Sequence, residues 1–213
     1  QELETLLNYK ALDVEFAIGI DGSVHILQVR PLTSYKYEIG SDNAIFESID
    51  SCIVKFNNLQ KNSPFVVGKS TIFGVMPDWN PAEIIGTKPN TLSFDLYRYL
   101  ITDEVWATQR AEYGYRDVRP HPLIVSFSGH PYVDVRASFN SFIPATLNNE
   151  LAGRLVDYYL LRLCNNPHYH DKVEFEIVPT CYAFNYDSWV ERLSKEGFSN
   201  DEIDELREGL CSI

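Results

Sequence analysis

An Asp-Gly pair between two segments of alternating polarity is the feature that most constrains how this chain can fold. The stretch VEFAIGIDGSVHILQVRPLT runs from Val14 to Thr33, with Asp21-Gly22 near its middle. Asp-Gly is a preferred pair in the two-residue type I′ turns that join antiparallel strands. We therefore predict a β-hairpin in which Ile20 lies opposite Ser23.

This turn determines which side chains share a face, because side chains alternate along a strand. One face is expected to be apolar and to belong to the core; it would carry Val14, Phe16, Ile18, Leu27 and Val29, with His25 as a packed, hydrogen-bonded residue. The other face would carry Ala17, Val24 and Ile26 near the turn and four polar residues at the open end, Asp13, Glu15, Gln28 and Arg30.

The four polar residues would form two neighbouring cross-strand pairs, with Glu15 opposite Gln28 and Asp13 opposite Arg30. Opposed Cβ atoms are about 4.5–5.5 Å apart, so both side-chain oxygens of such a pair can reach one small cation. Mg²⁺ takes oxygen ligands and commonly keeps substrate phosphates in its shell. Arginine binds phosphate as a bidentate, permanently charged donor.

Two hypotheses follow for these residues. They hold a metal–polyphosphate, or they lie on a surface hairpin with an Asp13–Arg30 ion pair. Periodicity alone favours the surface hairpin, because surface ion pairs are common.

The hairpin also resembles a known family. The residues DVEFAI, then DG, then ILQVRPLT resemble the end of the ATP-grasp nucleotide-binding domain of phosphoenolpyruvate synthase and pyruvate phosphate dikinase. The resemblance implies that Glu15 and Gln28 hold Mg²⁺, that Arg30 contacts the ATP phosphates and that Asp13 supports the site. The resemblance covers residues 1–33. Because of it, we favour the metal–polyphosphate hypothesis over the surface hairpin.

By this resemblance, the longer protein would transfer a phosphoryl group from ATP to a histidine elsewhere in the chain and then to pyruvate. Its partners would be ATP, pyruvate and the rest of the parent chain, including a phosphohistidine domain. The alternatives are a related dikinase with another acceptor, as in rifampin phosphotransferases, or a spacer or docking domain. We find neither a phosphate-cradling loop nor the family's phosphorylatable histidine, and we expect this piece alone to be inactive.

Composition narrows the classes of function. The chain has 213 residues and a formal net charge of −12, and no cluster of Lys and Arg, so nucleic acid and anionic membranes are poor candidate partners. We find no signal peptide or long apolar run, and we expect a cytoplasmic protein. The four cysteines, Cys52, Cys164, Cys181 and Cys211, are expected to be free buried thiols.

The remaining pattern predicts an α+β chain. We expect residues 1–35 to be the end of an ATP-grasp domain, 36–75 a linker with a helix, and 76–213 a helix-rich central domain with a small antiparallel sheet. The predicted elements are a short helix from an Asn80 cap to Gly86, a hairpin turning near 128–131, a helix over 148–163 and a half-exposed strand over 172–178. A pair of helices is predicted over 186–210, with Gly197 ending the first and Ser199 capping the second. Segments such as DWNPAEIIG and PYVDVRASFNSFIP resemble the central region of uncharacterised bacterial phosphoenolpyruvate-synthase-like proteins, which implies a position but no chemistry.

A second candidate site lies in this central region. Asp134 and Arg136 are expected on one strand face, with Asn140 in the following loop. Together with Arg116 and Arg119 they would form a pocket for a phosphorylated or carboxylated acceptor. The alternative, which we favour, is an ion-pair network that ties the second hairpin to a helix.

Overall fold

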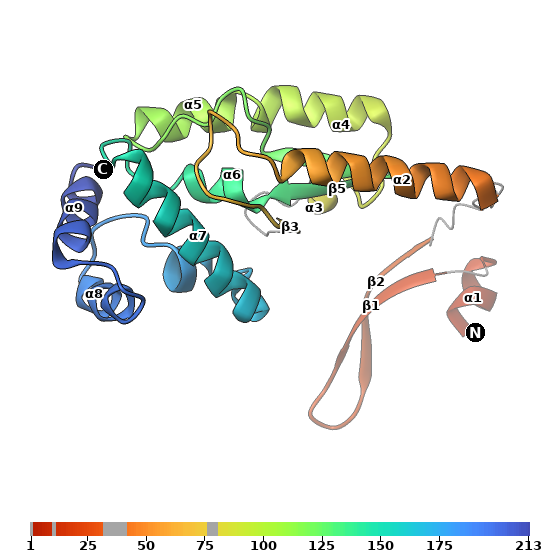
Figure 1. Ribbon diagram of the computed structural model, residues 1–213. Helices are drawn as coiled ribbons and strands as arrows, with labels where there is room; N and C mark the ends of the chain where they lie inside the picture. Colours follow the sequence, from red (N-terminus) through yellow and green to blue (C-terminus); the bar gives the residue numbers. More distant parts are fainter. Residues whose placement is uncertain (1, 10–11, 32–41, 76–80) are drawn as a thin grey trace. The chain divides into compact units, whose positions relative to one another are not determined.

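The structure is a computed structural model that describes residues 2–9, 12–31, 42–75 and 81–213 (Figure 1). The chain is α+β, as predicted, and divides into two compact units, Gln1–Ile45 and Phe46–Ile213. The division falls inside the predicted linker segment 36–75, and residues 46–75 are part of the second unit.

The first unit consists of a short helix and the predicted hairpin. Helix α1 (Glu2–Leu7) precedes strands β1 (Leu12–Ile18) and β2 (Val24–Pro31), which pair antiparallel. The turn differs from the prediction, because Gly19 rather than Ile20 pairs with Ser23, through a hydrogen bond of 2.7 Å from the Gly19 amide. The loop therefore has three residues, and Gly22 at its end has a φ of +81°, a value that glycine adopts without strain.

A β-bulge then restores the predicted register at the open end. Glu15 pairs with Gln28 but Phe16 pairs with Ile26, so Leu27 is the extra residue of the bulge. The faces near the turn are consequently exchanged relative to the prediction. Ile26 lies opposite Phe16, whereas His25 lies opposite Ala17 and not on the apolar face.

The apolar face of the hairpin is not a core within this unit. No described residue of the hairpin is buried; Phe16 is 56% exposed and Ile18 is 67% exposed. Helix α1 and this face line an open depression of about 680 Å³, bordered by Leu3 and Leu6 of the helix and by Leu12, Val14, Val24 and Ile26 of the strands, among others. The prediction that this apolar face is buried as part of a core is therefore wrong within the first unit.

The second unit is mostly helical around one small sheet. Its helices are α2 (Asp42–Leu59, which begins in the first unit), α3 (Pro81–Ile85), α4 (Thr91–Tyr97), α5 (Val105–Glu112), α6 (Val135–Asn140), α7 (Asn149–Asn165), α8 (Tyr186–Lys195) and α9 (Asn200–Cys211). Shorter turns are η2 (Arg98–Thr102), η3 (Pro167–Tyr169) and η4 (Val173–Ile177). Strands β3 (Phe73–Gly74), β4 (Ile124–Phe127) and β5 (His130–Asp134) form an antiparallel sheet with β5 in the middle.

Several local predictions in this unit are confirmed. The second hairpin turns at Ser128-Gly129, where both φ values are positive, as a type I′ turn requires. Helix α3 ends before Gly86, whose φ is +89°, whereas the predicted Asn80 cap lies outside the described residues. Ser199 and Glu202 form the capping box that begins α9.

The core lies where α6 and α7 meet the sheet and the C-terminal helices. Helix α7 buries one face, and α6 is buried along its whole length. In Figure 1, α8 and α9 lie on the left of the unit beside α7, and α4 and α5 follow one another along its top. None of the helices in the described part of the chain combines the length and apolarity needed to cross a bilayer.

The predicted strand over 172–178 is wrong. Residues Val173 to Ile177 form a π-helical turn, in which Val173 and Ile177 are buried and Phe175 is 75% exposed. Arg162 of α7 donates to the backbone oxygen of Glu176 at 2.7 Å, an acceptor that a strand would use in its ladder. The alternating sequence pattern suggests a strand, but contact with α7 favours a helical turn for these residues.

Candidate functional site

The four polar residues of the first hairpin come together as two adjacent pairs. Asp13 lies opposite Arg30 and Glu15 opposite Gln28. The guanidinium of Arg30 contacts both carboxylates: Nε lies 2.7 Å from Asp13 Oδ2, and Nη2 lies 2.9 Å from Glu15 Oε1. One arginine therefore holds two carboxylates that stand on the same face of one strand.

The electrostatics of this cluster are those of an exposed site. The hydrogen bond to Asp13, with the charges of Asp13 and Glu15, raises the pKa of Arg30 above its usual range. The side chains of the three residues are 43–54% exposed. Ion pairs of this exposure contribute little to folding, so their stabilising effect does not account for the arrangement.

Gln28 completes the donor set. It is exposed, and no described residue hydrogen-bonds its side-chain amide. The face thus presents two carboxylates and one amide oxygen, the oxygen ligands that Mg²⁺ prefers. Within the described residues no three His, Cys, Asp or Glu side chains gather as a metal site, so a cation here would need Gln28 and oxygens from its own ligand.

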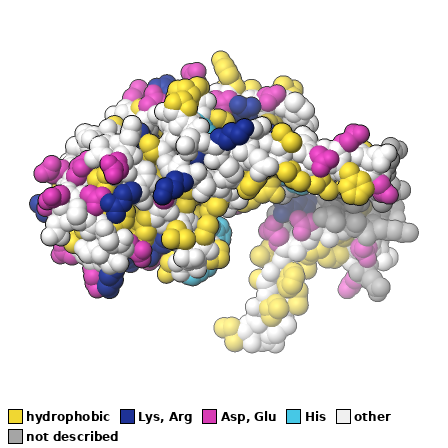
Figure 2. All heavy atoms as spheres, viewed as in Figure 1, with side chains coloured by type: hydrophobic (Ala, Val, Ile, Leu, Met, Phe, Trp, Pro, Cys, Tyr) yellow, Lys and Arg dark blue, Asp and Glu magenta, His cyan; other side chains and the backbone are white. Residues whose placement is uncertain are grey.

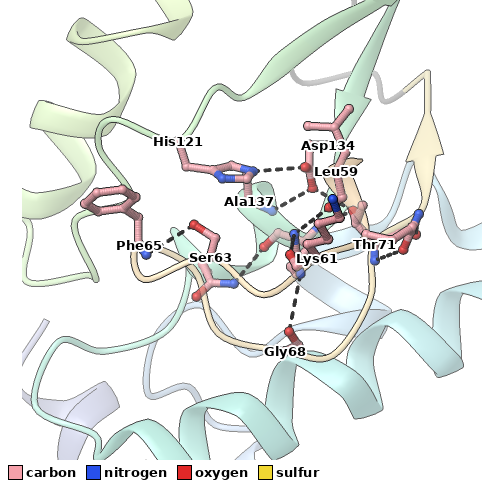
Figure 3. Close-up of polar contacts among 12 residues, drawn as sticks. Leu59, Lys61, Ser63, Phe65, Gly68, Thr71, His121, Asp134 and Ala137 are labelled. Atoms are coloured by element: carbon pink, nitrogen blue, oxygen red, sulfur yellow. Dashed lines mark hydrogen bonds and ion pairs between the residues drawn. The ribbon is translucent and has the colours of Figure 1, made fainter. Parts of the chain in front are cut away.

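The second candidate cluster is a buried network rather than an open pocket (Figure 3). Asp134 is fully buried and caps α6, accepting from the Ala137 amide at 3.1 Å. It also accepts from Thr71 Oγ1 at 2.6 Å, and its other oxygen lies 3.0 Å from His121 Nε2. These three partners all lie within the protein, so Asp134 serves the fold of this unit.

Arg136 is not on the strand, as the sequence analysis expected, but in the first turn of α6. It is fully buried, and its guanidinium donates to three backbone oxygens, those of Leu59 at 2.8 Å, Lys61 at 3.3 Å and Gly68 at 3.4 Å. Its amide also donates to Thr71 Oγ1. Arg136 thus fastens the end of α2 and the segment 59–71 to α6.

Asn140 belongs to the same network, one helical turn after Arg136. It lies in α6 and not in the following loop, and its side chain pairs with both backbone groups of Val67, accepting at 2.9 Å and donating at 2.9 Å. Gln60 makes the equivalent pair with the backbone of Thr71. Gln60 therefore joins the two ends of the segment 60–71, and Asn140 ties Val67 within it to α6.

The two remaining predicted residues, Arg116 and Arg119, form hydrogen bonds with residues outside this network. Arg116 donates to Asn149 at the start of α7, and burial lowers its pKa. Arg119 forms hydrogen bonds with Asp117 and Thr108. No described pocket is lined by Arg116 and Arg119 together with Asp134, Arg136 and Asn140.

Sequence reasoning missed the partners of this network. Gln60, Thr71 and His121 carry no local signal, because each is joined to α6 or β5 only through the tertiary fold.

The cysteines are free, as predicted, but Cys164, Cys181 and Cys211 are exposed rather than buried, and Cys52 is half-buried.

Comparisons with family models, with curated proteins and with solved structures give no match for this chain.

Proposed function

We propose that this chain is part of a phosphotransferase like phosphoenolpyruvate synthase, and that its first hairpin ends an ATP-grasp domain and binds Mg-ATP. The observation that carries the proposal is the pairing of Glu15 with Gln28 beside an Arg30 that already contacts Glu15. These groups lie on two neighbouring cross-strand pairs. The carboxylate and the amide oxygen suit the metal ion of a metal–polyphosphate, and the guanidinium suits its phosphates.

In this proposal each residue of the hairpin has a distinct role. Glu15 and Gln28 would hold Mg²⁺, and Asp13 would keep Arg30 oriented through its 2.7 Å contact. Arg30 would leave Glu15 and turn to the phosphates, so that it neutralises charge on the nucleotide. Bound Mg-ATP would supply the phosphoryl group, which a histidine elsewhere in the longer protein would accept and pass to pyruvate. Positioning and charge neutralisation are the main contributions that proteins make to phosphoryl transfer.

A titration of the longer protein with Mg-ATP tests the proposal. Gln28→Ala should weaken binding by about tenfold, the effect of losing one contact to a charged group. Gln109→Ala, which changes an exposed glutamine on α5, is the matched control and should leave the affinity unchanged. Equal affinities for wild type and Gln28→Ala would sink the nucleotide-site proposal and favour a spacer or docking role.

A second experiment concerns the acceptor. With nucleotide binding established, an acceptor screen of the longer protein separates pyruvate from other small acceptors, such as those of rifampin-phosphotransferase-like dikinases. Formation of phosphoenolpyruvate would support the first assignment. Phosphorylation of another compound with no turnover of pyruvate would support the related dikinase.

A spacer role has its own supporting observation. Asp134, Arg136 and Asn140 each make at least one hydrogen bond to the segment 59–71, and none of the three is exposed. The second unit thus has a buried polar network that would keep the segment 59–71 fixed against α6. This role and a nucleotide site on the hairpin are compatible within one protein.

A further inference from the structure

A groove separates α2 from the three-stranded sheet of the second unit. Its volume is about 530 Å³, and it is lined by Cys52, Ile53 and Phe56 of α2 and by Thr71, Ile72, Phe73, Phe127 and Tyr132. An amphipathic helix normally buries its apolar stripe, yet no described residue of α2 is buried. Figure 2 shows hydrophobic side chains gathered along α2, in keeping with this open packing.

The walls of the groove are formed by a chain of aromatic rings. The ring centroids of Phe56 and Phe73 are 5.7 Å apart, those of Phe73 and Phe127 are 5.0 Å apart, and those of Phe127 and Tyr132 are 5.9 Å apart. The planes of these pairs meet at 57–73°, so the rings contact one another in edge-to-face or tilted arrangements. Such walls suit a planar aromatic ligand, since aromatic pairs prefer edge-to-face or offset contacts.

Lys55 lies next to Phe127, one of the residues that line this groove. Lys55 Nζ donates to the backbone oxygen of Ser126 at 2.9 Å and lies 5.9 Å from the ring centroid of Phe127. No carboxylate in the described part of the chain pairs with Lys55, although the whole chain has a net charge of −12. An ammonium has three donors, so Lys55 has hydrogen bonds left for an anion.

We propose that this groove binds a small planar aromatic carboxylate, with its ring system between α2 and the sheet and its carboxylate on Lys55. The volume falls within the range of small-molecule sites, about 300–1,000 Å³. The lining is mostly apolar, and Lys55 lies next to it, against the ring of the lining residue Phe127. The groove shares no residue with the polar face of the first hairpin, so this site is independent of the Mg-ATP proposal.

Calorimetric titration of the 213-residue chain with 2-naphthoate tests the ligand class. We expect one binding site, and about tenfold weaker binding of the uncharged 2-naphthalenemethanol, since a hydrogen bond to a charged group is lost. Lys55→Met should cause a similar loss for 2-naphthoate, and Lys55→Arg should retain the affinity. Thermal unfolding of both variants checks that the fold is intact. Absence of binding, or equal affinity for the acid and the alcohol, would overturn the proposal.

Cys52 gives an independent readout of where the ligand lies. In a variant that keeps Cys52 as its one cysteine, saturating 2-naphthoate should slow alkylation by iodoacetamide severalfold. The matched control keeps only Cys164, which is exposed on α7 outside the groove lining, and its alkylation should not change. Equal protection of the two thiols, or no protection of Cys52, would contradict binding in this groove.

Discussion

Arg136 Nη2 lies 2.8 Å from the backbone oxygen of Leu59, and this contact joins the first turn of α6 to the last residue of α2. The last carbonyls of a helix have no partner within it and carry the negative end of the helix dipole. The fully buried guanidinium thus lies against helix-end and loop carbonyls. This one side chain thus donates to the last residue of α2 and to two residues of the segment that follows it.

Arg136→Met should therefore destabilise the protein strongly. Methionine fills a similar volume but leaves the carbonyls of Leu59, Lys61 and Gly68 without the donor that the fully buried Arg136 supplies. We expect the free energy of unfolding to fall by about 2–4 kcal/mol. Urea denaturation followed by circular dichroism measures this change.

The matched control is Arg207→Met on α9. This guanidinium makes a 3.8 Å pair with Asp204, and its side chain is 56% exposed. Surface pairs of this kind contribute about 0–1 kcal/mol, so the variant should unfold close to wild type. Equal losses for the two variants would show that the buried position of Arg136 has no special importance.

The elements that the sequence predicted correctly are those fixed by neighbouring residues. The turn at Ser128-Gly129 and the capping box of Ser199 and Glu202 depend on backbone preferences and side chains within a few residues. The pairing of Glu15 with Gln28 was predicted correctly although the turn was not, because the extra loop residue is offset by the bulge at Leu27.

The elements that were missed depend on residues distant in sequence. The strand pattern of Val173 to Ile177 gives way to a π-helical turn because it packs on α7. The roles of Arg136 and Asn140 are set by contacts with residues 59–68, which carry no motif. Sequence composition shows that such polar groups exist but not which backbone groups they will satisfy.

Gly209→Ala should destabilise the protein even though alanine favours a helix. A Cβ at this position would lie 2.5 Å from Leu147 Cδ1 and 2.9 Å from Pro144 Cβ. The proline ring is rigid, so α9 would have to shift away from it. We expect a loss of about 1–3 kcal/mol in the free energy of unfolding, as for other overpacked sites.

Gly153→Ala on α7 should have the opposite effect and serves as the control. The nearest atoms to its added Cβ would be Gly68 N at 3.7 Å and Val67 Cβ at 3.8 Å, which are ordinary contacts. The helix preference of alanine should then raise the free energy of unfolding by about 0.5–1 kcal/mol. Changes of the same sign in both variants would contradict the packing around Gly209.

Glu202→Gln should remove a pH-dependent part of the stability. Hydrogen bonding to the Ser199 amide, with a further contribution from Arg154, lowers the pKa of Glu202 below its ordinary value of 4.5. Because the pKa is lower in the folded protein, the carboxylate stabilises the fold above pH 4.5, and this is lost as the pH falls through the lowered value.

Glutamine can keep the capping hydrogen bond but not the charge. At neutral pH we expect Glu202→Gln to be less stable than wild type by about 0.5–1 kcal/mol. The difference should vanish below the lowered pKa, when both side chains are uncharged. Urea denaturation between pH 7 and pH 3 measures it; a difference that persists unchanged at acidic pH would indicate a steric effect instead.

Arg30→Met separates a structural from a ligand-binding role for the first hairpin. The side chain is 54% exposed and pairs with Asp13 and Glu15 at the surface, so its loss should leave the thermal unfolding of the chain unchanged. If the proposed Mg-ATP site exists, the same change in the proposed parent protein should weaken Mg-ATP binding by about tenfold, because one charged phosphate contact is lost. Binding of Mg²⁺ without nucleotide should not weaken, since the two carboxylates no longer share a cation. A lower unfolding temperature with unchanged affinity for Mg-ATP would instead assign Arg30 to the fold alone.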